Sequence, residues 1–263
     1  MRPLLGTYVE VGAQSAQSEL APAIDAAFEA IQEVQSLLSF HDAGSDLSRL
    51  NAAHGEEVML RPLSLRMLRL ARAMTRVSGG RFNCTVGGAL VRKGILPDHG
   101  LKSYQDGGSA DDIELCGNKA RLRSPVLLTL DGIAKGYAVD CAIRVLQRYG
   151  VEAGWVNAGG DLRVYGDIVL PVQRREMNGE FSALGGLRNA AIATSCIREA
   201  HDIDFPAWIV GGLHTSTPGV WSVLARSAWR ADALTKVAGV ASENEREALI
   251  RDLGGKLIEG MAA

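Results

Sequence analysis

The chain has 263 residues, of which 47% are hydrophobic, so it can bury a substantial core. Its 28 Lys and Arg residues are scattered and the formal net charge is −2, which argues against a nucleic-acid partner. No stretch approaches the roughly 20 apolar residues that span a bilayer, and the four cysteines have neither zinc-site spacing nor the density of a disulfide scaffold. We expect a soluble protein with reduced cysteines and a single domain over residues 1–263.

The first third of the chain predicts a strand and two amphipathic helices. Residues 7–12 alternate apolar and polar side chains and end at glycine, as in a half-buried strand. Apolar residues at three- and four-residue steps predict one helix over residues 20–38 and another over residues 63–77, which stops at a Gly-Gly pair. Between the two helices, the Ser and Asp residues of 40–51 predict a loop that leads into a short helix.

The rest of the chain mixes strands and helices without strict alternation. Weak apolar patches over residues 103–124 predict hairpins or surface connections, and residues 126–130 predict a compact buried strand. A helix is expected from residue 133 to residue 149, and a final helical segment from residue 231 to residue 253. Between them we expect strands that begin at residue 155 and cover residues 162–165, 168–172, 190–193, 208–210 and 222–225. This pattern predicts an α+β fold with mixed, largely antiparallel sheets packed with helices.

Residues 130–140 form a glycine-containing junction where a strand is predicted to end and a helix to begin. Such a junction presents backbone N–H groups and the positive end of a helix dipole, which suits a phosphate group. Lys135 adds a mobile cation, and Gly132 and Gly136 would let a ligand approach the backbone. The alternative is an ordinary strand-to-helix turn with a surface lysine.

Two further windows carry carboxylates. Gly159, Gly160 and Asp161 follow a predicted strand and form either a loop wall around a ligand or a hairpin turn. Asp232 and Thr235 lie three residues apart at a predicted helix start, so their oxygens can face the same point. Carboxylate and hydroxyl oxygens are ligands that Mg²⁺ prefers, although Asp232 could instead cap the helix.

Phe82 and Asn83 lie in a polar stretch that follows the second predicted helix. The aromatic ring and the neighbouring amide could contact a planar ligand ring and its polar edge. A phenylalanine in such a position is more often part of the core.

Seven short motifs, taken together and in this order, resemble the FAD:protein FMN transferases, the ApbE-type flavin transferases. The resemblance covers nearly the whole chain, and its most specific parts are Gly-Ile-Ala-Lys-Gly-Tyr at residues 132–137 and Ala-Asp-Ala-Leu-Thr at residues 231–235. The motifs are residues 3–7, 45–51, 80–87, 131–140, 157–161, 193–195 and 231–235.

The resemblance implies a T-fold-type α+β architecture that holds FAD in a cleft, with Mg²⁺ near the pyrophosphate. It also implies attack by a Thr or Ser hydroxyl of an acceptor flavoprotein subunit, with release of AMP. By motif position, the implied metal ligands are Asp232, Thr235 and the carbonyl oxygen of Ala134. The residues implied to contact FAD are Leu5, His41, Arg81, Phe82, Asn83, Asp131, Lys135 and Tyr137.

Several positions depart from the family pattern. Lys236 stands where many relatives have a second metal-binding Thr, so a permanent cation there would compete with the metal or partly replace it. His41 stands where Tyr is frequent, and Cys196 where Gly is frequent. The family's His-x-x-Asp-Pro segment is matched only in part, by segments that begin at His201 and at His214.

The resemblance leaves open how the reaction would proceed and where the protein acts. The base that takes the acceptor proton is either Asp232 or a nearby histidine. The alternatives to FMN transfer are hydrolysis of FAD to FMN and AMP, FAD binding or storage without turnover, and an enzyme unrelated to flavin. The chain as given is predicted to be cytoplasmic; the alternative is a periplasmic protein from which a signal peptide or lipoprotein anchor was removed.

Overall fold

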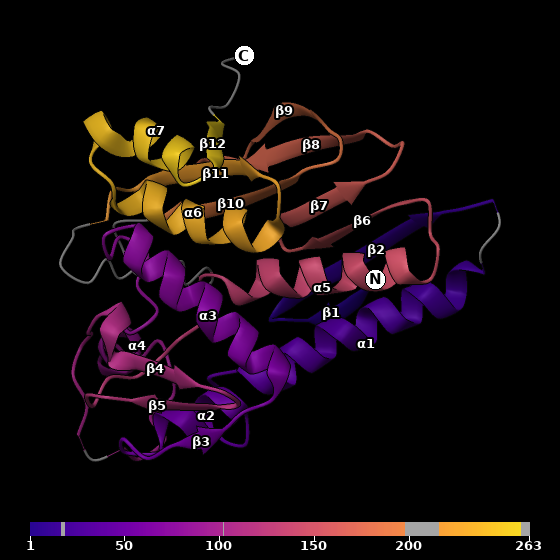
Figure 1. The fold of residues 1–263 in the computed structure, drawn as a ribbon. Helices are drawn as coiled ribbons and strands as arrows, with labels where there is room; N and C mark the ends of the chain where they lie inside the picture. Colours follow the sequence, from indigo (N-terminus) through magenta and orange to yellow (C-terminus); the bar gives the residue numbers. More distant parts are fainter. Residues whose placement is uncertain (17–18, 102, 198–215, 259–263) are drawn as a thin grey trace.

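The computed structural model describes residues 1–16, 19–101, 103–197 and 216–258. Its main feature is a seven-stranded antiparallel sheet in the order β1-β2-β6-β7-β10-β11-β12 (Figure 1). The strands are β1 (Arg2–Leu4), β2 (Thr7–Gln14), β6 (Ala153–Ala158), β7 (Asp161–Tyr165), β10 (Ala191–Ile197), β11 (Gly219–Ala225) and β12 (Gly255–Ile258).

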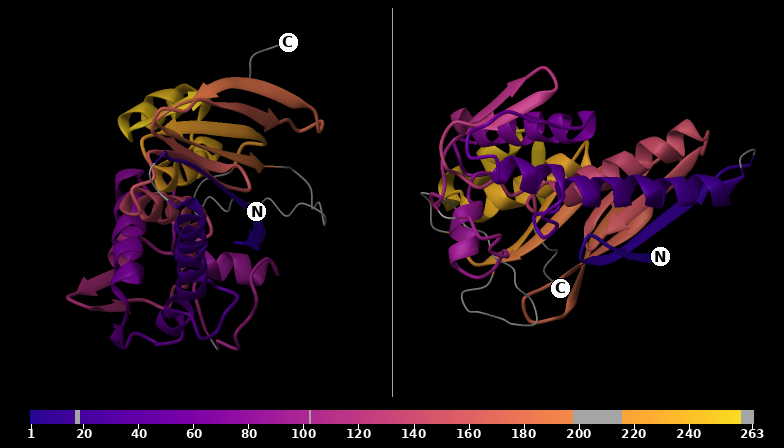
Figure 2. Two further views of the ribbon diagram at one scale, coloured as in Figure 1. Left: turned by 90° about the vertical axis from the view of Figure 1, so that its right-hand side faces the viewer. Right: turned by 90° about the horizontal axis from the view of Figure 1, so that it is seen from below.

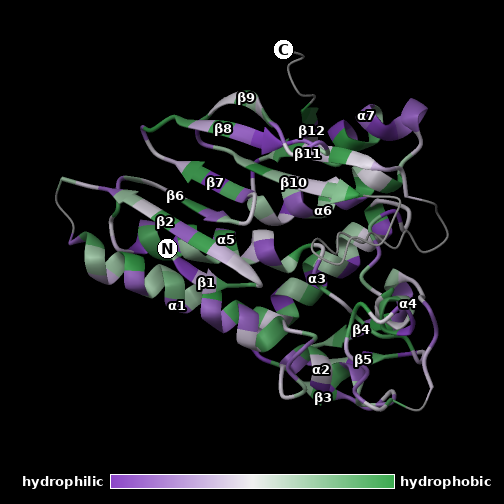
Figure 3. Ribbon diagram, turned by 180° about the vertical axis from the view of Figure 1, so that it is seen from behind, coloured by the Kyte–Doolittle hydropathy of each residue, from purple (hydrophilic) through white to green (hydrophobic). Residues whose placement is uncertain are grey.

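Three helices form a layer on one face of this sheet: α1 (Leu20–Leu38), α5 (Ala134–Arg148) and α6 (Ala228–Val240). They lie side by side below the strands in Figure 1, and Figure 2 shows the layer from two further sides. The helix α1 buries most of the apolar stripe that its sequence predicts, including Phe28, Ile31 and Val34. A fourth helix, α7 (Glu243–Asp252), follows α6 at the edge of the layer and is largely hydrophilic (Figure 3).

The other face of the sheet is covered in part by a hairpin of β8 (Leu170–Arg175) and β9 (Phe181–Leu187). A small apolar cluster lies there, built from Val164, Leu187 and Ile192. The next residue along β10, Ala193, instead packs on Ala231 of α6. Since neighbouring side chains of a strand point to opposite faces, the sheet separates these two apolar layers.

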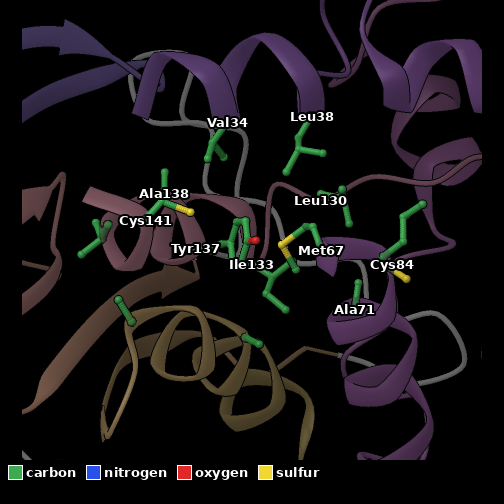
Figure 4. Packing of buried hydrophobic residues seen from close by; sticks show 14 of the residues in the cluster. Val34, Leu38, Met67, Ala71, Cys84, Leu130, Ile133, Tyr137, Ala138 and Cys141 are labelled. Atoms are coloured by element: carbon green, nitrogen blue, oxygen red, sulfur yellow. The ribbon is translucent and has the colours of Figure 1, made fainter. Parts of the chain in front are cut away.

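A smaller part of the molecule packs against the C-terminal end of α1 and the N-terminal end of α5 (Figure 1). It contains α2 (Asp46–Asn51), α3 (Pro62–Val77), α4 (Gly87–Arg92), a 3₁₀ turn at Ala110–Asp112, and a three-stranded sheet of β3 (Val58–Met59), β5 (Lys119–Leu122) and β4 (Ile113–Cys116). Met67, Leu130, Ile133 and Tyr137 are buried where α1, α3 and α5 meet (Figure 4). One hydrophobic cluster therefore runs through both parts of the chain.

The mixed, largely antiparallel α+β fold is confirmed, but residues 126–130 are not a regular strand. They are buried, and only Leu127 makes an isolated bridge, with Val86. Leu128 bonds to the side chain of Asn51 through both its N–H (2.8 Å) and its C=O (2.9 Å), and the N–H of Thr129 bonds to the carbonyl of Cys84 (2.9 Å). The Asn51 side chain thus makes the hydrogen bonds to the Leu128 backbone that a neighbouring strand would have made in the predicted sheet.

Other differences concern the last helical segment and several short elements, among them the unpredicted strand β3 and helix α4. The segment predicted as one helix over residues 231–253 is two helices, because Ser242 and Glu245 form a capping box that starts α7. The strands β1, β9 and β12 were not predicted, and the strand predicted at residues 208–210 lies outside the described residues. Within the described ranges, no helix is long and apolar enough to cross a membrane.

Candidate functional site

Two tight turns lie side by side at one end of the large sheet. Leu5 and Gly6 connect β1 to β2 with positive φ angles of 56° and 70°, and the N–H of Leu5 donates to Oε1 of Gln35 (2.7 Å). In the β6–β7 turn, a Cβ added to Gly159 would lie 2.6 Å from Oγ1 of Thr7. A leucine in the left-handed region is a strained conformation of the kind that clusters at functional sites.

The start of α5 meets α6 so closely that only glycine fits. A Cβ added to Gly136 would lie 2.3 Å from the carbonyl oxygen of Ala228. The N–H of Gly136 donates to Oδ2 of Asp232 (3.1 Å), and the N–H of Ala134 donates to the carbonyl of Leu130 (2.7 Å). In this structure Gly136 therefore serves helix packing, and the positive end of the α5 dipole is matched by the Asp232 carboxylate.

A second buried carboxylate fixes the start of α6. Asp140, in the middle of α5, accepts hydrogen bonds from the N–H groups of Ala228 and Trp229 (3.0 Å each) and forms an ion pair with Arg163. Asp140 thus caps α6 from a neighbouring helix. This contact sets the rotation of α6 that directs Asp232 toward α5.

Lys236 is surrounded by oxygen atoms. Its Nζ contacts Oδ1 of Asp232, lies 3.1 Å from Oγ of Ser195 and lies 3.2 Å from Oγ1 of Thr235. Oγ1 of Thr235 also lies 2.7 Å from Oγ of Ser195 and donates to the carbonyl of Asp232 (2.7 Å). Asp232 and Thr235 are fully buried. The structure therefore brings the two predicted side-chain metal ligands together, with a lysine between them and solvent.

Lys135 and Asp161 form a second lysine–carboxylate pair beside the first. Nζ of Lys135 lies 4.0 Å from Oδ2 of Asp161, a buried oxygen that has no hydrogen-bond partner among the residues that the structure describes. Burial raises the pKa of Asp161 to about 7, and the nearby Asp232 carboxylate adds to that rise. The Asp161 carboxylate in turn raises the pKa of Lys135, which stays a cation. Asp161 was not among the predicted site residues, although it follows the Gly-Gly turn that marked a ligand loop.

The remaining residues predicted to contact FAD lie in different environments. Arg81 makes a two-point ion pair with Glu245 of α7, with distances of 3.0 and 2.8 Å. Asn83 donates to the carbonyl of Gly108 (2.9 Å) and accepts from the N–H and hydroxyl of Thr85. For both residues, contact with FAD stays a prediction.

Phe82 and Tyr137 are core residues in this structure, with 4% and 2% of their surface exposed. Figure 4 shows Tyr137 beside Ile133 and Met67. His41 and Asp131 are exposed, yet the protein atoms packed around Asp131 raise the pKa of its carboxyl, and Thr129 and His41 oppose that rise. The core position of Phe82 agrees with the alternative that its sequence context left open.

Two cavities lie nearby in the described part of the chain, and neither is lined by Lys135, Asp161, Asp232 or Lys236. One, of about 700 Å³, is lined by residues of the α3–α4 region and the loop before β4, including Gly79, Gly80 and Asn83. The other, of about 470 Å³, lies under the β8–β9 hairpin and reaches Asn157 and Gly160. Both have volumes typical of small-molecule sites. His201 and His214, the two candidates for the family histidine, lie outside the described residues.

The sequence matches the model of the ApbE family over residues 5–258. An FAD:protein FMN transferase of Treponema pallidum is 26% identical over 307 aligned positions, which cover 96% of this chain and 81% of that protein. An FAD:protein FMN transferase of Vibrio cholerae is 28% identical over 149 positions, which cover 52% of this chain and 44% of that protein.

Solved structures show the same fold. The flavin transferase ApbE from Vibrio cholerae superposes with a TM-score of 0.79 at 21% identity, covering 99% of this chain and 96% of that one. The ApbE protein from Thermotoga maritima has a TM-score of 0.83 at 21% identity, covering 97% and 91%. Because the family model matches nearly the whole chain, this chain belongs to the ApbE family.

Proposed function

We propose that this protein is a flavin transferase that moves the FMN half of FAD onto a Thr or Ser hydroxyl of an acceptor flavoprotein and releases AMP. The relatives named above as FAD:protein FMN transferases support the flavin substrate. The observation that carries the proposal is the cluster of Lys135, Asp161, Asp232 and Lys236 at the start of α5. Such a cluster can hold a charged phosphate group and move a proton beside it.

The reaction needs one bond to form and one to break. The acceptor hydroxyl oxygen attacks the phosphorus of the FMN half, and the bond from that phosphorus to the bridging oxygen breaks, so AMP leaves with the bridging oxygen. Negative charge grows on the phosphate oxygens during this step. Lys135, whose side chain is 36% exposed, is free to reach these oxygens while it remains near Asp161.

The hydroxyl proton must pass to a base, and the structure favours Asp161 over Asp232 for this role. Both carboxylate oxygens of Asp232 are engaged, Oδ2 by the N–H of Gly136 and Oδ1 by Lys236. Oδ2 of Asp161 is buried and accepts no hydrogen bond within the described part of the chain. A carboxylate oxygen that accepts no hydrogen bond can take up a proton without first breaking one, and here protonation weakens only the 4.0 Å ion pair with Lys135.

Mg²⁺ remains a prediction from the family resemblance, and the residues present do not fit it as they stand. Asp232 and Thr235 supply oxygens of the right type, but both already contact the ammonium group of Lys236. Within the described ranges, no group of three or more His, Cys, Asp or Glu side chains is arranged to hold a metal ion. We therefore assign no step of the reaction to a metal.

FAD binding without turnover is the second candidate function. It is favoured by the ion pair of Asp232 with Lys236, because that pair engages the carboxylate that the resemblance places at the reaction centre. A protein of this kind would hold FAD tightly and release no AMP. Hydrolysis of FAD by water would release AMP without any acceptor.

The test combines FAD with the purified protein and a candidate acceptor flavoprotein subunit, with AMP followed by chromatography and covalent flavin by mass spectrometry of the acceptor. We expect AMP and flavin-labelled acceptor in equal amounts. Asp161→Asn is expected to lower the rate by roughly 10²–10⁴-fold, as for loss of a general base. Asp167→Asn, at an exposed position paired with Arg188, is the matched control and should keep the wild-type rate.

Three other results would contradict FMN transfer, and each indicates a different conclusion. AMP with free FMN and no labelled acceptor would identify a pyrophosphatase. Bound FAD without AMP would identify a carrier. If the protein has no affinity for FAD at all, the proposal is wrong.

A further inference from the structure

The ammonium group of Lys236 has a complete set of oxygen acceptors. An ammonium group donates three hydrogen bonds, and Nζ has three oxygen neighbours: a carboxylate oxygen of Asp232 and the hydroxyl oxygens of Ser195 and Thr235. Carboxylate and hydroxyl oxygens are also what a hard divalent ion seeks. Two of the three residues are those that the family resemblance assigned to the metal.

These oxygens are held in place by contacts of their own. Asp232 accepts the N–H of Gly136 on its other carboxylate oxygen (3.1 Å). Oγ1 of Thr235 lies 2.7 Å from both Oγ of Ser195 and the carbonyl oxygen of Asp232. The three acceptors thus form a rigid group contributed by β10 and α6.

The stem of Lys236 also has a defined seat. A Cβ added to Gly132 would lie 3.4 Å from both Cγ and Cε of Lys236, so the stem lies across the face of this glycine. The Lys236 side chain is 18% exposed. Holding the Lys236 side chain in this position costs little free energy, because its stem packs along the backbone and its ammonium group contacts three oxygens.

A divalent ion would have to compete with this tethered cation. The ammonium is always present, since its chain attachment keeps it beside the oxygens, whereas Mg²⁺ must be taken from solution and lose part of its tightly held water. Mg²⁺ and the ammonium group would repel each other strongly if both contacted the same oxygen of Asp232. The buried Asp232 carboxylate already has its counter-charge.

We propose that Lys236 takes the place of a divalent ion in this site, so that the protein is stable and binds the pyrophosphate of FAD without Mg²⁺. Binding of FAD without Mg²⁺ rests on the proposed function. Replacement of the divalent ion by Lys236 does not, because the oxygen group and the lysine are present in the free protein. Both are tested by comparing wild type with Lys236→Thr, which removes the ammonium and adds a hydroxyl oxygen.

The first measurement is made without FAD. Heat release and melting temperature are recorded while MgCl₂ is added to each protein, with CaCl₂ as a second ion. Wild type should show no saturable binding and no more than the small general salt effect on melting. Lys236→Thr should bind about one Mg²⁺ per chain and melt higher as the ion is added. If Lys236→Thr folds only when Mg²⁺ is present, that result also supports the proposal.

Two further variants separate charge from shape. Lys236→Met removes the ammonium and adds no oxygen, so we expect a lower melting temperature and a weaker response to Mg²⁺ than Lys236→Thr shows. Lys256→Thr makes the same substitution at an exposed position of β12 and should behave like wild type.

The second measurement follows FAD binding by flavin fluorescence in EDTA and in MgCl₂. Wild type should bind equally well in both, within about twofold, while Lys236→Thr should bind at least about tenfold more weakly in EDTA. The proposal is overturned if wild type binds Mg²⁺ saturably, or if its FAD affinity rises with Mg²⁺ as much as that of Lys236→Thr. If no variant binds FAD, the proposed function is wrong, and the measurement without FAD still tests the role of Lys236.

Discussion

At the scale of single residues, the four cysteines lie in very different environments, and all four are free thiols. Cys84 is buried beside Thr75, and burial raises the pKa of its thiol from 9.0 to about 11. Cys116 ends β4 at the surface. Since the thiolate is the reactive form, the two thiols should differ in both access and chemistry.

We predict that iodoacetamide at mildly alkaline pH labels Cys116 rapidly and Cys84 only after unfolding, as measured by mass spectrometry of peptides over time. The pKa of Cys84 is higher in the folded than in the unfolded state. Its contribution to stability is therefore fully present below the unfolded value near 9.0 and is lost as the pH rises through about 11. Equal labelling rates for the two thiols in the native protein would contradict this description.

At the scale of helices and strands, the crossing of α5 and α6 decides the geometry of the site. The two helices approach until Gly136 faces the carbonyl of Ala228, and this approach is what lets the N–H of Gly136 reach Asp232. The cap that Asp140 provides for α6 supports the same geometry. A change at the crossing should therefore affect stability and ligand binding together.

We predict that Gly136→Ala lowers the free energy of unfolding by about 1–3 kcal/mol, because its methyl group would force the two helices apart. Urea unfolding measures this change, and FAD titration measures the accompanying loss of affinity. Gly107→Ala is the control, since a Cβ at Gly107 would have no neighbour nearer than 3.6 Å among the described residues. A Gly136→Ala protein as stable as the control would show that the helices can move apart without cost.

At the scale of the whole molecule, the pair of Arg81 and Glu245 links the part built on α3 to α7 beside the large sheet. Glu245 also closes the capping box of α7, so the pair joins two parts of the chain that are distant in sequence. The Arg81 hydrogen bond holds the pKa of Glu245 below its usual range, so the pair is ionised at neutral pH. If Arg81 contacts FAD, the Glu245 carboxylate competes with the ligand for the guanidinium group.

We predict that Glu245→Gln gives a slightly lower urea midpoint and a higher affinity for FAD, because the amide keeps an oxygen for the capping box and releases the charge of Arg81. Glu114→Gln removes an ion pair within the small sheet and is the control for a general change of surface charge. An unchanged FAD affinity in Glu245→Gln would show that Arg81 does not bind FAD.

The sequence by itself determined the elements with strong periodicity. The apolar stripes of α1 and α3 and the alternation in β2 predicted their positions closely, because local backbone geometry and one buried face suffice to specify them. The mixed antiparallel fold followed from the irregular order of the predicted strands and helices, and the family followed from the order of the short motifs. Asp232 and Thr235 contact the same ammonium group, that of Lys236, as their spacing on a helix predicted, while their role as metal ligands stays a prediction.

Only the tertiary structure decided which groups meet across the chain. The side chain of Asn51 satisfies the backbone of Leu128, 77 residues away, so an apolar run that reads as a strand joins no sheet. Asp161 became a candidate base only when folding buried one of its oxygens without a hydrogen-bond partner in the described part of the chain. Lys236 reaches Ser195 because α6 packs on β10. Such contacts depend on packing between distant segments, and no local pattern along the sequence encodes them.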